Sequence, residues 1–256
     1  MILKPLTSTA AVQEVGRDNH RWFQVPRRAS VKSYLVTSSM ARNTKYALKR
    51  NTQTILTDII RTRIADINLP RYPKGPALHF YHRVLALRRL FPSVSSFLAS
   101  NDCTEILYAA LLSWDMNSRA AKMKDYADFK SNLQGASAAF QAVEAASQSF
   151  TWTNRTTVVL AVSSLFDSLC LMKTEGRVVS NSKCMHFVFP DLCIPADSHT
   201  FEKLYGKNAG GTKDRFMEVL EFSYDILNGI QSPQQYLDNV WNATLTKLVD
   251  NAIILM

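Results

Sequence analysis

The sequence has few cysteines, and no two of them lie two or three residues apart. Iron–sulfur clusters usually need thiolates at such close spacing, so this kind of site is not expected. The start of the chain also lacks the basic-then-apolar order of a signal peptide. We therefore expect a soluble cytoplasmic protein whose thiols are reduced and mostly buried, without disulfides or a cofactor. The four cysteines of the 256-residue chain are Cys103, Cys170, Cys184 and Cys193.

Apolar runs of membrane-spanning length are missing as well. The most apolar window extends from Thr156 to Met172 and contains Asp167. A membrane helix needs about 20 predominantly apolar residues, so this window is too short and carries a charge. It predicts a buried core helix, and we expect no membrane partner.

Acidic residues are absent between Asp18 and Asp58, and the stretch from Arg61 to Arg89 contains only Asp66. The net charge of +9 is therefore concentrated in the first third of the chain. Such clustering favours a polyanion, with nucleic acid first and an anionic membrane surface second, although a solvated basic surface would look the same. The basic residues of the first stretch are Arg21, Arg27, Arg28, Lys32, Arg42, Lys45, Lys49 and Arg50.

Apolar residues recur mostly at helical spacing, and alternating strand patterns are few and short. The pattern predicts a mainly α protein of roughly ten helices. The breaker-rich segment from Pro70 to Pro76 suggests two parts, a basic helical region over residues 1–75 packed on a helical core over residues 76–256. Arg42, Lys45 and Lys49 fall on one helical face, where they could follow a phosphate backbone.

The segment "SNSKCMHFVFPDLCIPADSHT", residues 180–200, holds the candidate chemistry. Asn181 and Ser182 predict a helix start that places Lys183 in the first turn, and Asp197 is a natural N-cap for the next helix. A lysine at the positive end of a helix, partly buried, should have a lowered pKa. A nearby aspartate can orient the amine or stabilise a cation on a substrate. A surface lysine and a purely structural cap remain the alternative reading.

This segment resembles the helix-hairpin-helix segment of the HhH-GPD superfamily of DNA glycosylases, especially the branch that removes oxidised guanine. The counterparts are Ser182-Lys183-Cys184, the apolar stretch His186 to Phe189, and Pro195-Ala196-Asp197-Ser198-His199. The resemblance implies a two-lobed helical fold with the active-site cleft between the lobes. It also implies that Lys183 attacks the sugar C1′ while Asp197 activates the amine and stabilises positive charge on the sugar.

A second likeness lies in "LYAALLSWDMNSRAAKM", residues 107–123, which resembles the family's turn whose side chains enter the gap left by an extruded nucleotide. Asn117 and Arg119 would take these roles, although a helix cap and a surface arginine are equally compatible. Asn181, Ser182 and His199 are further DNA-contact candidates. The family hairpin is glycine-rich, whereas this chain has Val-Ser-Asn-Ser at 179–182.

The resemblance implies a monomeric glycosylase that flips a damaged or modified base out of double-stranded DNA and leaves an abasic site. Whether Lys183 also cleaves the strand, and whether the role is repair or defence against modified viral DNA, stays open. Two alternatives are a non-catalytic nucleic-acid-binding module and an RNA-binding or membrane-surface protein. A zinc site is not expected from Cys184, His186, Cys193 and His199, because no paired Cys-x-x-Cys is present.

Overall fold

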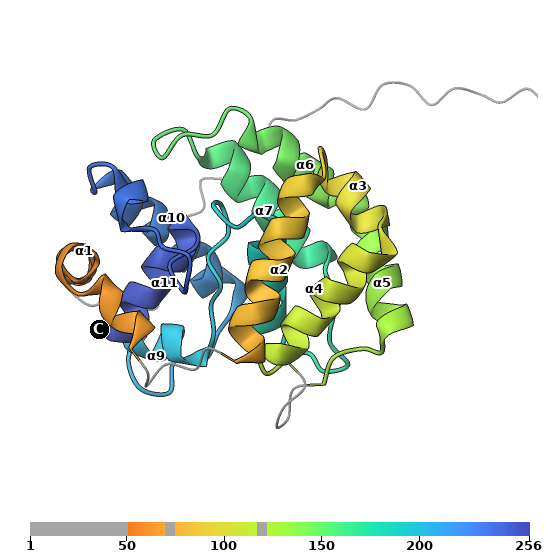
Figure 1. Cartoon of the computed structure of the whole chain (residues 1–256), viewed down its shortest axis with the longest axis horizontal. Coiled ribbons are helices and arrows are strands. Elements are labelled where there is room, and N and C mark those ends of the chain that lie inside the picture. Colours follow the sequence, from red (N-terminus) through yellow and green to blue (C-terminus); the bar gives the residue numbers. More distant parts are fainter. Residues whose placement is uncertain (1–50, 70–74, 117–121) are drawn as a thin grey trace, which may run out of the picture. The chain divides into compact units, whose positions relative to one another are not determined.

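The computed structural model describes residues 51–69, 75–116 and 122–256, all of which belong to one compact unit, Arg42–Met256. These ranges contain helices and one isolated β-bridge between Met123 and Met172, but no strand (Figure 1). The predicted mainly α fold is therefore confirmed. The helices are α1 (Thr52–Thr62), η2 (Ile64–Asn68), α2 (Pro76–Leu90), α3 (Val94–Ala99), α4 (Asn101–Ser113), α5 (Tyr126–Gly135), α6 (Ser137–Ser147), α7 (Thr156–Ser168), α8 (Val178–Val188), α9 (Ser198–Tyr205), α10 (Lys213–Asn228), η3 (Pro233–Tyr236) and α11 (Leu245–Leu255).

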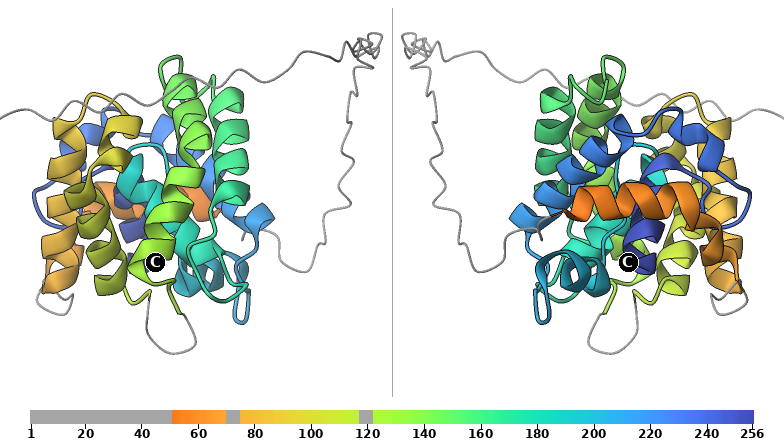
Figure 2. Two further views of the ribbon diagram at one scale, coloured as in Figure 1. Left: turned by 90° about the vertical axis from the view of Figure 1, so that its right-hand side faces the viewer. Right: turned by 90° about the vertical axis from the view of Figure 1, so that its left-hand side faces the viewer.

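Helix α11 is the most completely buried helix of the described chain. Every residue from Leu245 to Leu255 is buried except Ile254, which is 37% exposed. The helix contacts α1, η2, α9 and α10, and the second view in Figure 2 shows α1 crossing it. A helix that is enclosed on nearly all sides can hold charged side chains only if they find partners inside the protein.

The remaining long helices pack in neighbouring pairs. Helix α2 lies beside α4, α3 contacts α4 and α6, and α6 lies beside α7 (Figure 1). Helix α8 contacts α2 and α4 as well as α10, which packs on α11. Helix α8, which carries Lys183, therefore lies within the packed core, whereas Ser198 and His199 at the end of the segment are exposed.

The apolar window at 156–172 forms helix α7, as predicted, and the helix ends at Ser168. One face packs inward through Val162 and Leu165, whereas Leu160 on the other face is 64% exposed. Asp167 points away from the core and pairs with Lys213 at 2.5 Å. Among the described residues, no helix combines the length and apolarity needed to cross a bilayer. The division at residues 75 and 76 remains a prediction.

Candidate active site around Lys183

Helix α8 begins at Val178, so Lys183 is its sixth residue and lies in mid-helix. The prediction of a first-turn position is wrong, because Asn181 does not start the helix. Its side-chain amide instead donates to the carbonyls of Phe166 and Leu169, at 3.0 and 3.2 Å, where α7 ends. Those two bonds hold α8 against α7. The helix begins at Val178, three residues before the predicted start at Asn181.

Asp197 is the N-cap of α9, as the sequence predicts. Its carboxylate Oδ1 accepts hydrogen bonds from the backbone N–H of Thr200 at 3.0 Å and from the Thr200 hydroxyl at 3.3 Å. The Asp197 backbone N–H donates in turn to the Thr200 hydroxyl at 3.1 Å, which completes a capping box. The second oxygen, Oδ2, makes no hydrogen bond to any described residue, so it can take another partner.

A buried hydroxyl joins the two ends of the segment. Ser182 Oγ donates to the carbonyl of Ala196 at 2.9 Å and accepts from the backbone N–H of Ala196 at 3.1 Å. Because Lys183 follows Ser182 and Asp197 follows Ala196, this clamp brings the amine and the carboxylate into one neighbourhood. Ser182 and Asn181 are both fully buried. Their predicted contact with DNA is corrected to an internal structural role.

Lys183 is half-buried, and its Nζ donates to the carbonyl of Trp114 at 2.9 Å and lies 5.6 Å from the centroid of the Trp114 ring. No carboxylate of the described residues comes within ion-pair distance of it. Burial lowers the pKa of the Lys183 ammonium below its ordinary value, and the negative charge of Asp197 opposes part of that effect. The lowered pKa agrees with the sequence prediction, but its cause is burial and not a helix start.

Aromatic rings line the same region. The Trp114 ring centroid lies 4.7 Å from that of Phe187, 5.3 Å from that of Tyr81 and 6.4 Å from that of Trp241. The Tyr81 ring stacks on His186 with centroids 5.6 Å apart and an interplanar angle of 23°. We call these five residues the aromatic cluster. It forms a low-dielectric wall beside the Lys183 amine, which explains why the charged amine is disfavoured.

His186 is fully buried, as predicted, and both ring nitrogens have partners. Nδ1 lies 2.8 Å from the carbonyl of Cys193 and 3.2 Å from the Thr246 hydroxyl, and Nε2 lies 3.2 Å from the Tyr81 hydroxyl. A carbonyl can only accept, so Nδ1 carries the proton of the neutral ring. Burial lowers the pKa of His186 to about 3 and raises that of the Cys184 thiol to about 12. No group of three possible metal ligands gathers within the described ranges.

An ion pair that the sequence reasoning missed lies next to this cluster. Lys247 Nζ and Asp250 Oδ2 on α11 are 2.5 Å apart, and both side chains are less than a tenth exposed. The Lys247 amine also lies 5.2 Å from the Trp114 ring centroid and 5.5 Å from that of Trp241. A lysine and an aspartate three residues apart in the mostly apolar stretch "LTKLVDNAIIL" are the signal that could have indicated a buried pair.

Among the described residues, the predicted contact His199 does not belong to this site. His199 is exposed in the first turn of α9, 3.8 Å from the carboxylate of Glu202. Its contact with DNA remains a prediction. The remaining candidates lie outside the described residues, namely Arg42, Lys45, Lys49, Asn117 and Arg119.

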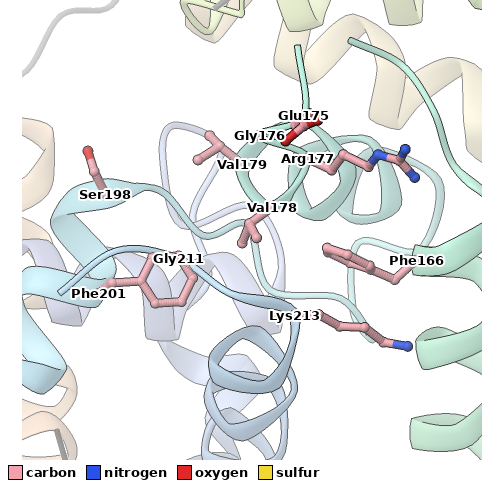
Figure 3. A pocket seen from close by; sticks show the side chains of 10 residues that line it. All are labelled: Phe166, Glu175, Gly176, Arg177, Val178, Val179, Ser198, Phe201, Gly211 and Lys213. Carbon is pink, nitrogen blue, oxygen red and sulfur yellow. The ribbon is translucent and has the colours of Figure 1, made fainter. Parts of the chain in front are cut away.

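A cavity of about 550 Å³ lies at the start of α8 (Figure 3). Three helices begin at its edge, because Val178, Ser198 and Lys213 are the first residues of α8, α9 and α10 and all line it. Arg177 and Lys213 contribute positive side chains, with the Phe166 ring between them in Figure 3, while Glu175 contributes a negative one and Lys213 is paired with Asp167. Helix starts and cationic side chains both favour an anion.

Comparison of the chain with protein-family models, curated proteins and solved structures finds no match. The likeness to helix-hairpin-helix glycosylases therefore depends on the residues of this sequence alone. Chemically, the site offers an amine whose neutral form is more populated than that of an ordinary lysine, a carboxylate with one oxygen available, and an aromatic wall. Such a set suits attack by an amine on an electrophilic carbon with stabilisation of a nearby positive charge.

Proposed function

We propose that this protein is a DNA glycosylase that removes a damaged or modified base, with Lys183 as nucleophile and Asp197 as its partner carboxylate. The observation that supports the proposal is a partly desolvated lysine whose pKa responds to the charge of Asp197, together with the Ser182 clamp between the residues that precede them. The motif likeness at residues 176–205 supplies the reaction class. The same likeness implies a two-lobed helical fold.

Protonation decides whether Lys183 can act. Only a neutral amine has the free electron pair needed to attack a sugar carbon, and an ordinary lysine is almost fully charged at neutral pH. Burial lowers the pKa of Lys183 and thus increases the neutral fraction. The amine forms the new bond to C1′ while the C1′–N bond to the base breaks and the base leaves with that electron pair. Positive charge that develops on the sugar is stabilised by the Asp197 carboxylate through Oδ2.

The charge of the protein supports a DNA substrate. The chain carries a net charge of +9, and the cavity at the start of α8 combines Arg177 and Lys213 with three helix starts. We propose that a backbone phosphate of the bound duplex lies at this cavity. Ser198, which lines it, directly follows Asp197, so a phosphate there would place the strand next to the proposed catalytic residues.

Borohydride trapping tests the proposal directly. Borohydride reduces the Schiff base between an amine and an opened sugar, so incubation with lesion-containing or abasic duplex DNA should leave a covalent protein–DNA adduct. We expect the adduct to disappear in Lys183→Gln and to persist in the matched control Lys207→Gln, which changes an exposed lysine after α9. Asp197→Asn should slow adduct formation by about 10²- to 10⁴-fold, the usual contribution of a positioned acid–base group.

Base release identifies the substrate class. Duplexes containing normal, oxidised or modified bases are compared for the free base that each one yields. Release of oxidised purine alone supports a repair role, and release of a bulky modified cytosine supports defence. Release without any trappable adduct would contradict Lys183 as nucleophile.

A second candidate is a nucleic-acid-binding module without catalysis. It is favoured by the hydrogen bond from Lys183 Nζ to the carbonyl of Trp114, because a protonated amine that holds a carbonyl can be purely structural. In that case the protein binds duplex DNA with a strong salt dependence, yet neither releases a base nor forms an adduct.

A further inference from the structure

The Lys247–Asp250 pair is buried on helix α11, where apolar residues lie beside buried polar ones such as Thr246 and Asn251. Its two side chains are 7% and 8% exposed, and neighbouring positions on α11 are filled by apolar residues such as Leu248 and Val249. Taking two charges out of water is unfavourable, and apolar residues of similar size often stabilise a core as well or better. Stability alone therefore gives no reason for this pair.

The location of the pair gives a better reason. The ammonium of Lys247 lies 5.2 Å from the centroid of the Trp114 ring, and that of Lys183 lies 5.6 Å from the same centroid. The Trp114 carbonyl also accepts a hydrogen bond from Lys183. One indole thus has two lysine amines beside it, one from α8 and one from α11.

Two positive charges that share a low-dielectric wall disfavour one another. The charged groups that act on Lys183 come from three elements: Asp197 at the start of α9, Lys247 and Asp250 on α11, and Asp115 just after α4. After burial and the opposing charge of Asp197, Lys247 has the largest influence on the pKa of Lys183 and lowers it. Asp250 acts in the opposite direction and more weakly.

We propose that Lys247 and Asp250 are a positioning pair that sets the protonation of Lys183 across the Trp114 ring. Lys247 repels the proton of Lys183, and Asp250 holds the Lys247 ammonium in place and partly offsets its charge. The use of this control rests on the proposed function, because a nucleophilic lysine must be neutral. The electrostatic control itself can be measured in the free protein without DNA.

Nuclear magnetic resonance of the full chain labelled with carbon-13 at lysine Cε provides the test. The resonance of Lys183 is identified by its loss in Lys183→Arg, and its shift is followed through neutral and alkaline pH. In Lys247→Met the titration midpoint of Lys183 should rise, with a several-fold smaller neutral fraction at neutral pH. In Lys247→Arg, which keeps the charge because arginine stays protonated, the midpoint should remain close to that of the parent.

A double variant separates an electrostatic effect on Lys183 from structural damage, because the two shift the Lys183 titration midpoint in opposite directions. Adding Asp250→Asn to Lys247→Arg removes the offsetting carboxylate while the guanidinium stays charged, so the Lys183 midpoint should fall below that of Lys247→Arg. Loosened packing would instead admit water and raise the Lys183 midpoint, both in Lys247→Arg and in the double variant. A control, Lys173→Met, removes a surface lysine–aspartate pair whose members are not among the groups that act on Lys183, and it should leave the midpoint unchanged.

The outcomes are decisive in both directions. The proposal is supported if the Lys183 midpoint rises in Lys247→Met and falls in Lys247→Arg with Asp250→Asn. An unchanged midpoint with methionine, or a rise in every variant, overturns it. If the arginine variants fail to fold, Asp250→Asn alone decides, because loss of the offsetting carboxylate should lower the Lys183 midpoint, whereas admitted water would raise it. Correct midpoint shifts in a parent protein that neither releases a base nor forms a DNA adduct would refute the glycosylase and leave the positioning pair intact.

Discussion

Replacing Ser182 with alanine should separate the clamp from the rest of helix α8. The hydroxyl makes two hydrogen bonds to the backbone of Ala196, and both residues are fully buried. Loss of the hydroxyl leaves a buried N–H and a buried carbonyl without that partner, which costs about 1–3 kcal/mol. The higher helix propensity of alanine returns only about a few tenths of a kcal/mol.

Ser180→Ala is the matched control for this substitution. Ser180 is also buried and lies in the same helix, but its hydroxyl bonds only to the nearby Arg177 carbonyl and the Asn181 side chain. The change in helix propensity is therefore the same in both variants. The difference between them should isolate the link to the 193–197 connector, and we expect Ser182→Ala to be less stable by about 2 kcal/mol.

Urea unfolding and thermal melting measure this difference. For a domain of this size, each kcal/mol corresponds to roughly 2–4 °C in melting temperature. The clamp also holds Asp197 near Lys183, and Asp197 raises the pKa of Lys183. The titration midpoint of Lys183 should therefore fall in Ser182→Ala and stay constant in Ser180→Ala. Equal unfolding free energies and equal midpoints in the two variants would refute the reasoning.

Three further predictions concern packing and pH. Gly211→Ala should destabilise the protein by about 1–3 kcal/mol in urea unfolding, because its new Cβ would lie 2.7 Å from the buried Phe201 ring. Gly210→Ala is the control, since its Cβ would meet nothing within 4 Å and the change should be neutral. The pKa of His186 is lowered to about 3, so between about pH 6.5 and 3 the unfolded chain binds a proton that the native state does not. Stability should therefore fall as pH drops through this range. His186→Gln should flatten this dependence in acid titrations. The lowered pKa of Lys183 means that stability rises with pH up to about 10.4, the ordinary lysine value, and Lys183→Met should remove that rise.

Local signals allowed the sequence to predict some of these features correctly. Asp197 stands three residues before Thr200 at the start of an apolar pattern, and capping depends on such near neighbours. His186 lies in an apolar run, so its burial could also be predicted. The helix from Thr156 followed from its composition alone. Each of these inferences needs only a few adjacent residues.

Features that depend on distant residues could not be predicted in the same way. Asn181 looks like a helix start until the carbonyls of Phe166 and Leu169 are placed beside it, and these belong to another helix. The approach of Lys247 to Trp114 joins residues more than a hundred positions apart in the chain. Spacing along the sequence carries no information about such contacts, so the position of the charge pair behind the site could not be predicted.

The burial of Cys184, described above with His186, has a practical consequence for the study of motion. A thiol must be both exposed and deprotonated to react with an alkylating reagent, and the native environment of Cys184 opposes both conditions. The alkylation rate of Cys184 therefore reports how often helix α8 opens locally to solvent. Because Lys183 precedes it directly, the same label would also report opening of the helix at the amine.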